Sequence, residues 1–388
     1  RTTGVLYVLD EPSIGLHPSN VEGLLGVVDD LLADGNSVVV VDHDVRVLRH
    51  ADHLIEVGPG SGKNGGTIIC QGSVCEVEKD GASRIAPFLS GECVIRTRQR
   101  AESSTMFDLG RIHLETGRIH TVRPLSVDVP QGRMVVVTGV SGSGKTTMVL
   151  ESLVPALRAG IEGEPLPAYV RTCDAPGIRR VCLIDSTPIG ANVRSTVATY
   201  SGVMDDLRRA FAQTTDAKAR GLHAGDFSYN TGSLRCPTCD GTGTISLDVQ
   251  FLPDVEIDCP DCHGSRYAQT AWEVRRHTTR GAGGEKGDYL SLPQLMEMTV
   301  DEALGRLGRL RRVAAKLQTL SDIGLGYLTL GEATPALSGG EAQRLKLSSE
   351  IGRSQEGTLF VFDEPTIGLH PLDVEVLLGV LQGLVEHG

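Results

Sequence analysis

The sequence predicts an α/β protein that contains two copies of one domain. The main observation is an internal repeat: residues 6–18 read LYVLDEPSIGLHP, residues 359–371 read LFVFDEPTIGLHP, and ten of these thirteen positions are identical. The similarity continues downstream, over residues 21–35 and 374–388. A repeat of this length is typical of tandem domains. The second observation is that short apolar strands alternate with helical stretches, which indicates a parallel sheet covered by helices.

In the first copy we expect a buried strand over residues 5–9 (VLYVL), a helix over about 19–32 and a second strand over 37–43 (SVVVVDH). The Gly-rich stretch 58–72 predicts turns and a hairpin. From 76 to about 110 the apolar pattern weakens and charge rises, which indicates a linker.

In the second copy we expect a buried strand over residues 134–139 (MVVVTG) and a helix that begins near Lys145. The α/β pattern then breaks and resumes at Leu359. The interruption holds four clustered cysteines, a Gly-rich turn over 281–287 and an amphipathic helix near 300–320.

These elements predict an α/β fold with an α+β insertion. We expect the C-terminal lobe of the first copy over 1–90, a linker over 91–118 and the second copy over 119–388. Within the second copy, residues 160–330 form the insertion, and 232–268 form its cysteine module. Because the chain opens at Arg1 inside a repeated motif and stops at Gly388, where the first copy continues into a strand, we expect it to be an excerpt of a longer protein.

The composition excludes some classes of protein. The chain has 388 residues, of which 40% are hydrophobic, and no run of 18 apolar residues, which argues against a membrane span. Its net charge of -12 argues against a wholly basic nucleic-acid binder. The acidic excess lies outside residues 171–280, which hold 13 Lys/Arg and 13 Asp/Glu. Four of the nine cysteines form one tight set, which favours a metal site in a reducing, cytoplasmic compartment over a disulfide framework.

Residues 139–147, GVSGSGKTT, match the phosphate-loop pattern G-x-x-x-x-G-K-[ST] after a predicted strand. Glycines let backbone N–H groups turn towards phosphate oxygens, Lys145 adds a positive charge, and the Thr146 hydroxyl is placed to bind magnesium. The alternative is a Gly-rich turn without a ligand, which the motifs below disfavour. The predicted nucleotide-binding residues of this loop are Gly139, Ser141, Gly142, Gly144, Lys145, Thr146 and Thr147.

The repeated motif supplies acidic residues at the end of a strand. In LFVFDE (359–364), Asp363 is placed to hold magnesium and Glu364 to polarise an attacking water. Alone such a motif is weak evidence, but together with a phosphate loop it becomes strong. In the first copy Asp10 and Glu11 occupy the same positions, so we assign Asp10 to magnesium and Glu11 to catalysis.

Residues 337–344, LSGGEAQR, place Ser338, Gly339 and Gly340 where a loop enters a helix, and such a terminus offers N–H groups to an anion. The alternative, compatible with the first, is an ordinary capping box between Ser338 and Glu341. The motif lies about 20 residues before LFVFDE and resembles the signature of the ATP-binding cassette superfamily, whose fold is that of the P-loop NTPases. In that superfamily the signature of one cassette closes over the ATP held by another. The resemblance also makes His43, in VVVVDHD, the histidine that contacts the γ-phosphate.

CPTCDGTG (236–243) and CPDCHGSR (259–266) form two C-x2-C pairs. Four thiolates suit a closed tetrahedral zinc site, with Cys236, Cys239, Cys259 and Cys262 as ligands, so His263 is left out. The module could be a structural clip, a direct DNA contact, or both.

Nearly the whole chain resembles the UvrA family, the A subunit of the bacterial excision nuclease. The motifs that carry the resemblance are ADHLIEVGPGSGKNGG, TGVSGSGKTT, GDFSYNTGSLRCPTCDGTG, IGLGYLTLGEATPALSGGEAQRLKL and DEPTIGLH. The resemblance implies an ATP hydrolase that uses ATP, Mg²⁺ and Zn²⁺ and binds duplex DNA as a homodimer. It also implies recognition of damaged or distorted DNA in nucleotide excision repair, with the helicase subunit UvrB as partner and no membrane association.

The sequence departs from the family pattern at three places. Ser186, in IDSTPIG, replaces the ATP-sensing Gln, the stretch TGRIHTVRPLSVDVP lacks the usual HNLKN-like segment, and ANVRS keeps only Arg194 and Ser195 of RTPRS. These changes indicate a diverged paralogue, and an alternative function is antibiotic resistance or DNA protection with weakened hydrolysis. A transporter ATPase is a third possibility that the cysteine module disfavours. Seven arginines could track phosphates or simply face solvent: Arg194, Arg208, Arg209, Arg235, Arg266, Arg275 and Arg276.

Overall fold

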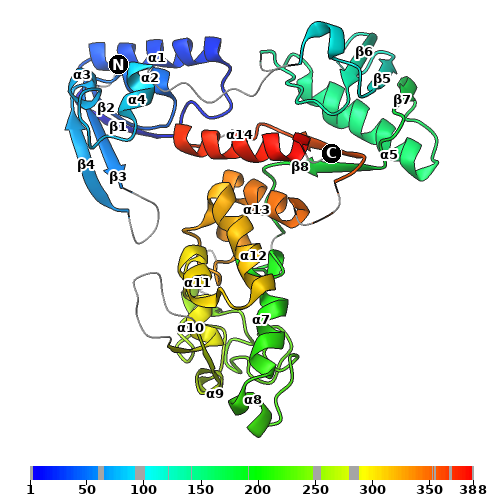
Figure 1. Cartoon of the computed structure of the whole chain (residues 1–388). Coiled ribbons are helices and arrows are strands. Elements are labelled where there is room, and N and C mark those ends of the chain that lie inside the picture. Colours follow the sequence, from blue (N-terminus) through cyan, green and yellow to red (C-terminus); the bar gives the residue numbers. More distant parts are fainter. Residues whose placement is uncertain are drawn as a thin grey trace. The chain divides into compact units, whose positions relative to one another are not determined.

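The structure is a computed structural model that describes residues 3–59, 65–91, 101–120, 122–140, 142–190, 192–247, 255–278, 288–351, 353, 355–366 and 369–386. The chain forms two compact units (Figure 1). Unit 1 consists of residues 1–186 and 354–388, and unit 2 of residues 187–353. Within the described ranges, no helix is both long and apolar enough to cross a membrane.

Unit 1 begins with the strand–helix–strand arrangement that the sequence predicts. Strands β1 (Leu6–Asp10) and β2 (Ser37–Val41) pair in parallel, and α1 (Pro18–Ala33) connects them. The expected burial of the first strand is wrong in part, because Leu6 and Val8 are 61% and 65% exposed. Both strands alternate exposed and half-buried positions, as expected for a two-stranded sheet covered on one face.

The predicted hairpin is confirmed as β3 (Leu54–Gly58) paired with β4 (Thr67–Gly72). Residues 60–64 of its turn lie outside the described residues. Three short helices accompany the hairpin: α2 (Val45–His50), α3 (Val74–Val77) and α4 (Ala86–Ser90). Val77 and Leu89 are each 1% exposed in a core shared with Leu54, so the segment up to residue 90 is folded rather than a linker.

A three-stranded antiparallel sheet follows, in the order β6–β5–β7: Leu125–Pro130, Arg111–Thr116 and Val170–Asp174. The middle strand β5 therefore lies inside the expected linker 91–118. Its side chains Ile112 and Leu114 pack against Leu157 of α5 (Val154–Glu162), which continues a π-helix, η3 (Thr147–Leu153). Pairing with strands distant in sequence, such as Leu114 with Cys173, explains why the local pattern did not predict β5.

The strand expected at residues 134–139 is wrong. Among the described residues this segment pairs with no strand, and Val136 is 75% exposed. Apolar composition predicts burial, but a strand also needs a hydrogen-bonded neighbour. The strand expected at LFVFDE is confirmed as β13 (Thr358–Phe362), which pairs in parallel with β8 (Arg180–Ile184). Helix α14 (Pro371–Glu386) then repeats α1 and has the same length of 16 residues.

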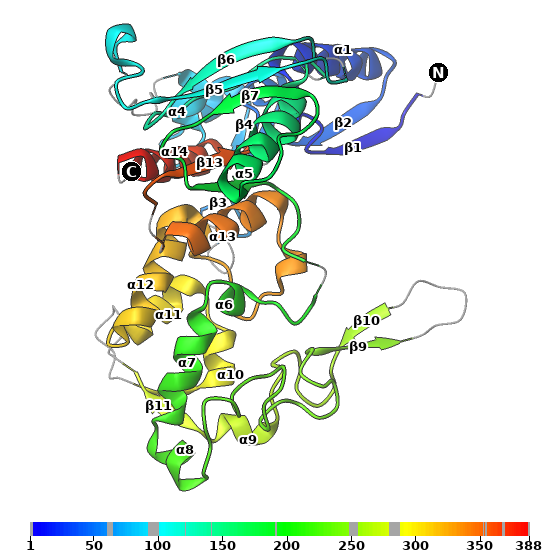
Figure 2. The same ribbon diagram turned by 90° about the vertical axis from the view of Figure 1, so that its right-hand side faces the viewer.

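Unit 2 is mainly helical. The views in Figures 1 and 2 agree that α7 (Val203–Ala212), α11 (Val300–Leu307) and α12 (Arg311–Leu320) lie close together. The single helix expected near 300–320 is therefore two helices. Residues 308–310, Gly-Arg-Leu, separate them, and Gly disfavours a continuous helix. The remaining helical elements of unit 2 are α6 (Val197–Tyr200), α8 (Thr215–Ala219), α9 (Gln269–Trp272), α10 (Leu292–Met296), η4 (Ser321–Leu325), η5 (Thr334–Ala336) and α13 (Gly339–Ile351).

The insertion also contains two small antiparallel pairs. Strands β9 (Thr244–Leu247) and β10 (Val255–Asp258) form one pair (Figure 2), and Cys259 directly follows β10. Strands β11 (Arg275–His277) and β12 (Tyr289–Ser291) form the other. The Gly-rich turn expected at 281–287 lies outside the described residues.

Candidate functional site

The phosphate-loop motif forms a tight turn at the start of a helix. Gly142 and Gly144 have φ angles of 77° and 96°, which side chains other than glycine rarely adopt. Helical structure begins at Lys145, as expected. The Lys145 Nζ donates hydrogen bonds to the carbonyl oxygens of Gly139, at 2.8 Å, and Val140, at 3.1 Å. The ammonium group therefore lies over the turn formed by its own loop. Thr146 and Thr147 follow in the first helical turn, and Ser141 lies outside the described residues.

Both predicted glutamates adopt the same unusual backbone conformation. Glu11 has φ of 46° and Glu364 has φ of 45°, in the left-handed region that costs a non-glycine residue energy. Each follows an aspartate, Asp10 or Asp363, at the end of a parallel strand. Backbone N–H groups fix these turns to the neighbouring strand: Glu11 donates to the Val41 carbonyl at 2.7 Å and Asp363 to the Ile184 carbonyl at 3.3 Å. Such outliers are concentrated at functional sites.

His43 contacts one of these glutamates. Its Nε2 lies 3.2 Å from Glu11 Oε1, with both side chains about one third exposed. The neighbouring Asp42, which the sequence interpretation missed, organises this corner. Its carboxylate accepts hydrogen bonds from the Ser13 hydroxyl at 2.6 Å and from the backbone N–H groups of Ser13, His43 and Asp44. The sequence signal that could have identified Asp42 is its position between the valine-rich strand and His43.

Unit 1 brings most of these residues around one cavity of about 690 Å³. Glu11, Asp42 and His43 line it from the first copy of the repeat, and Lys145 and Glu364 from the second. The further lining residues are Ser13, Ile14, Gly15, Leu16, His17, Asp44, Val45, Arg46, Phe88, Gly139, Thr366, Leu369, Pro371 and Val374. A lysine, two glutamates and a histidine around one cavity match the groups that phosphoryl transfer to water needs.

His370 of the second copy packs beside this cavity against the first copy. Its ring centroid is 6.1 Å from that of His43 and 6.5 Å from that of Phe88, both edge-to-face. Burial is the main cause that lowers the pKa of His370 below its usual value. The imidazole is therefore favoured in its neutral form, in which Nδ1 accepts a hydrogen bond from the Leu372 N–H at 3.2 Å.

The signature motif caps helix α13 in unit 2. Ser338 N–H donates to the Glu341 carboxylate at 2.7 Å, and Glu341 N–H donates to the Ser338 hydroxyl at 3.3 Å. The capping box expected from the sequence is therefore present. The Tyr327 hydroxyl also donates to the Glu341 carboxylate. Ser338 and Gly339 are exposed and Gly340 is half-buried, so the start of the helix is accessible.

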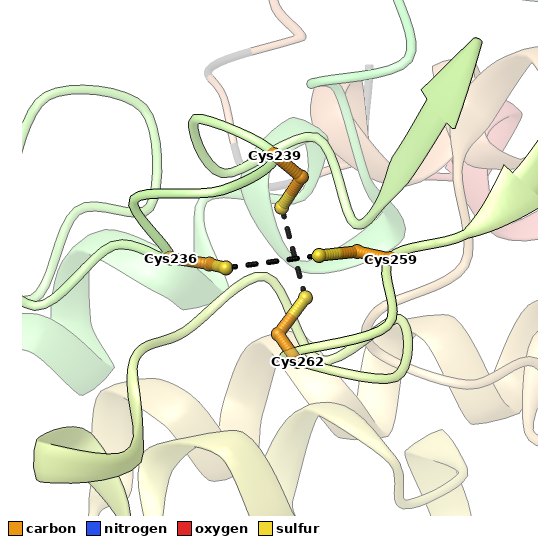
Figure 3. A group of neighbouring side chains, drawn as sticks. All are labelled: Cys236, Cys239, Cys259 and Cys262. Atoms are coloured by element: carbon orange, nitrogen blue, oxygen red, sulfur yellow. Dashed lines mark hydrogen bonds between the residues drawn. The ribbon is translucent and has the colours of Figure 1, made fainter. Parts of the chain in front are cut away.

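The four predicted metal ligands come together as a buried cluster (Figure 3). All four sulfur atoms lie within 4.8 Å of one another, and Cys236–Cys259 and Cys239–Cys262 are 3.9 and 3.6 Å apart. A tetrahedral site with Zn–S bonds of about 2.3 Å needs sulfur atoms about 3.8 Å apart, so the cluster is compatible with zinc. The group contains no histidine, in agreement with the omission of the exposed His263.

The two C-x2-C pairs have similar local backbones. The residue after the second cysteine is left-handed in both, with φ of 53° at Asp240 and 49° at His263, and a left-handed glycine follows each. Burial raises the pKa of Cys239, but hydrogen bonds, first from the Gly243 N–H, outweigh it and lower the pKa to about 7. Burial raises the pKa of Cys262 to about 12. A bound cation would favour the thiolate form of both.

UvrABC system A proteins resemble this chain over its full length. UvrABC system protein A of Aquifex aeolicus is 42% identical over 392 residues, which cover 100% of this chain and 41% of that protein. The Synechocystis protein of the same name is 42% identical over 389 residues, which cover 100% of this chain and 39% of that protein. The crystal structure of UvrA2 from Deinococcus radiodurans matches with a TM-score of 0.87 and 40% identity, covering 100% of this chain and 45% of that one.

This chain belongs to the UvrA family. It spans about two fifths of the length of the curated relatives it matches. No family model matches the sequence. The structural match confirms the predicted α/β ATP-binding cassette fold, and the cysteine cluster accords with a zinc-containing insertion.

Two of the three departures from the UvrA family pattern concern residues near the predicted nucleotide site and the cysteine module. Ser186 lies two residues after β8, the strand that pairs with β13, and it is exposed. Arg194 and Ser195, which remain of the altered motif ANVRS, lie in unit 2, where Arg194 donates to the carbonyl of Asp240 in the cysteine module.

The seven arginines considered as phosphate contacts all have partners within the chain. Arg194 and Arg235 pair with Asp240, and Arg208 and Arg209 pair with Asp205 and Asp206. Arg266, Arg275 and Arg276 donate to the carbonyl oxygens of Val193, Trp272 and Ala210. Arg266 is only 8% exposed and burial lowers its pKa, so little of it is available to a nucleic acid. The partners of these side chains depend on tertiary structure and were not predictable from the sequence.

Proposed function

We propose that the parent protein of this chain is an ATPase that binds duplex DNA and recognises damaged or distorted sites in nucleotide excision repair. The observation that carries the proposal is the cavity of about 690 Å³ that Lys145, Glu364, Glu11 and His43 line. Membership of the UvrA family supports the DNA-repair part. The damage-specific step, the homodimer, the helicase partner UvrB and the cytoplasmic location belong to this proposal.

In this proposal the phosphate loop binds ATP through Gly139, Gly142, Gly144, Ser141 and the N-terminus of the helix at Thr146 and Thr147. Lys145 would exchange the carbonyl oxygens it now contacts for phosphate oxygens. Magnesium, held by Thr146 and by Asp363 or Asp10, would neutralise charge on the phosphates. Glu364 and Glu11 would each orient a water, and His43, already beside Glu11, would contact the γ-phosphate. Ser338, Gly339 and Gly340 would close over a nucleotide bound to another phosphate loop.

We propose zinc as the metal of the cysteine cluster, because four thiolates at these separations suit its bond lengths. Zinc would hold together a module that has little apolar core of its own, since the buried cluster consists of the four cysteines with Ile245 packed against it. The test is chelation of the purified protein with a strong zinc ligand. One zinc released per chain, followed by loss of structure confined to unit 2, would support the assignment, and an unchanged metal content in a Cys259→Ser variant would contradict it.

The experiment that tests the main function is the ATPase rate of the full parent protein with intact and with lesion-bearing duplex DNA. A Lys145→Ala variant is the control for hydrolysis at the second phosphate loop. Stimulation that differs between the two DNAs supports damage sensing, and identical rates with both DNAs contradict it. We also expect the present chain alone to bind ATP weakly and hydrolyse it very slowly, since Lys145 and Ser338 would each need a partner from another cassette. A fast rate that Lys145→Ala abolishes would contradict this.

Ser186 supports a second candidate function, antibiotic resistance or DNA protection with weakened hydrolysis. A serine side chain is too short to reach the magnesium and water that a glutamine at this position would contact. Under this alternative the parent protein binds ATP and DNA without a DNA-dependent rate, and Ser186→Gln restores that rate. A rate that does not change in Ser186→Gln would instead support serine as a tolerated substitution.

A further inference from the structure

The segment 192–198 of unit 2, called here the bridging segment, is held on one side by the cysteine module. Arg266 Nη1 donates to the Val193 carbonyl at 2.8 Å, and the Tyr229 hydroxyl donates to the Arg194 carbonyl at 3.1 Å. The Arg194 guanidinium reaches back to Asp240, donating to its carbonyl at 2.8 Å and its carboxylate at 3.0 Å. Arg266 and Asp240 of the module, together with the nearby Tyr229, therefore hold this segment.

The contacting groups are tied directly to the cysteine cluster. Asp240 directly follows Cys239, and the carbonyl of Arg266 accepts a hydrogen bond from the Cys236 N–H at 3.0 Å. The Arg266 guanidinium lies over the Tyr229 ring, 5.3 Å from its centroid. The turn after Cys239 also packs tightly on Tyr229, since a Cβ added at Gly241 would lie 1.7 Å from the Tyr229 carbonyl oxygen. The cluster geometry thus sets where the bridging segment is held.

On its other side the bridging segment is bonded to the chain that leads into the signature loop. Thr334 N–H donates to the Ser195 carbonyl at 2.9 Å, and Val197 N–H donates to the Glu332 carbonyl at 3.0 Å. Thr196 and Ala333 form a β-bridge. Thr196 and Thr334 are 0% and 1% exposed, so these bonds are shielded from water. Only the short turn η5 (Thr334–Ala336) and Leu337 separate this contact from Ser338.

We propose that the cysteine module positions the signature loop through the bridging segment, and that Arg266 and Arg194 are the positioning residues. Arg266 is suited to this because a buried guanidinium forms strong, directional hydrogen bonds and cannot lose its charge near neutral pH. The connection makes the geometry at Ser338 depend on an intact metal cluster. Its effect on ATP rests on the function proposed above for Ser338, whereas the connection itself does not.

Hydrogen exchange of the metal-loaded full chain tests the proposal. Arg266→Met keeps an unbranched apolar stem at this position but removes the guanidinium, and with it the donor to Val193. We expect about tenfold faster amide exchange in peptides covering 192–198 and also in those covering 330–340, the effect of losing about 1.4 kcal/mol of local stability. Bound zinc, measured by release to a chromogenic chelator, should not change. Arg266→Lys should restore part of the protection. Arg275→Met is the matched control because, among the described residues, the Arg275 guanidinium donates only to the Trp272 carbonyl, at 3.4 Å.

A second pair of variants keeps the proposal testable if Arg266→Met loses its metal. Arg194→Met removes both hydrogen bonds between the bridging segment and Asp240, whereas Asp240→Asn weakens only the one to the carboxylate. Asparagine tolerates the left-handed backbone of position 240. Both should speed exchange at 330–340, Asp240→Asn by less, and the double variant should do no more than Arg194→Met alone. Faster exchange confined to 192–198 in these variants would overturn the proposal. ATP binding is measured separately, so a chain that shows the exchange response but binds no ATP would refute the proposed function and leave the connection standing.

Discussion

Asp42 should stabilise the corner of the cavity where Ser13, His43 and Asp44 meet. Its carboxylate accepts four hydrogen bonds, at 2.6, 2.7, 2.9 and 3.1 Å, of which three come from backbone N–H groups. A hydrogen bond to a charged group contributes about 1.5–3 kcal/mol, but Asp42 is only half-buried and water can replace part of each bond. We expect Asp42→Ala to cost this corner about 3 kcal/mol, which corresponds to roughly a hundredfold faster local opening.

The assay is amide hydrogen exchange in peptides that cover residues 10–17 and 41–46. Asp42→Asn should cost only about 1 kcal/mol, because its remaining oxygen can still accept from His43, Asp44 and the Ser13 hydroxyl while its amide faces the Ser13 N–H. Asp52→Ala, which removes an exposed aspartate with no side-chain hydrogen bond among the described residues, should leave the exchange unchanged. If Asp42→Ala exchanges no faster than the Asp52→Ala control, the carboxylate does not hold the corner.

Three further predictions concern other parts of the chain. Gly241→Ala should lower the melting temperature of unit 2 far more than Gly264→Ala, although the two glycines have similar φ angles of 79° and 83°. The Cβ added at Gly241 would lie 1.7 Å from the Tyr229 carbonyl oxygen, whereas the Cβ added at Gly264 would lie 3.8 Å from Asp258. Equal melting temperatures would contradict this. Asp128→Asn should bring the pKa of His113, which the side-chain hydrogen bond to Asp128 raises, back towards its usual value in an NMR titration. A histidine whose pKa is raised by folding stabilises the fold at pH values below its pKa in the unfolded chain, and this contribution is lost as pH rises through its pKa in the folded chain. The variant should therefore be less stable than the parent only at acidic pH. An unshifted titration of His113 would refute its pairing with Asp128. Glu364→Gly should raise the stability of unit 1 by about 1 kcal/mol by relieving the left-handed backbone, while it abolishes the proposed hydrolysis; a melting temperature below that of the parent chain would contradict the strain argument.

The sequence predicted the elements whose signals are local. The first strand–helix–strand unit, β13 and the start of the helix at Lys145 all follow from short apolar runs, helix caps and glycines. The strand expected at 134–139 was wrong, and β5 was missed, because strand formation depends on partners far along the chain, such as Cys173 for Leu114. The same reason applies to the surface charges, whose partners the sequence does not reveal.

The site residues were more predictable than the fold around them because their chemistry is concentrated in short motifs. The cysteine spacing identified all four members of the buried cluster, and the phosphate-loop and DE motifs identified Lys145, Glu11 and Glu364, which share one cavity. Asp42 was missed because it acts on backbone N–H groups rather than on a ligand. Arg266 was considered as a possible phosphate contact on the surface, but it is only 8% exposed. It is buried against Tyr229 and Val193, which precede it by 37 and 73 positions, so the local sequence does not reveal its burial.

The paired glutamates offer an argument for function that is independent of any relative. Glu11 and Glu364 occupy equivalent positions of the repeat, and both hold φ near 45°, where glycine would be free of strain. The backbone bonds of Glu11 to Val41 and of Asp363 to Ile184 impose the turn whatever the side chain at the strained position. Keeping a carboxylate there twice costs stability twice, about 1–2 kcal/mol for each left-handed residue. Neither side chain is needed to make the turn, and both line the same cavity as Lys145. The chemistry of the carboxylate therefore explains best why a glutamate occupies each position.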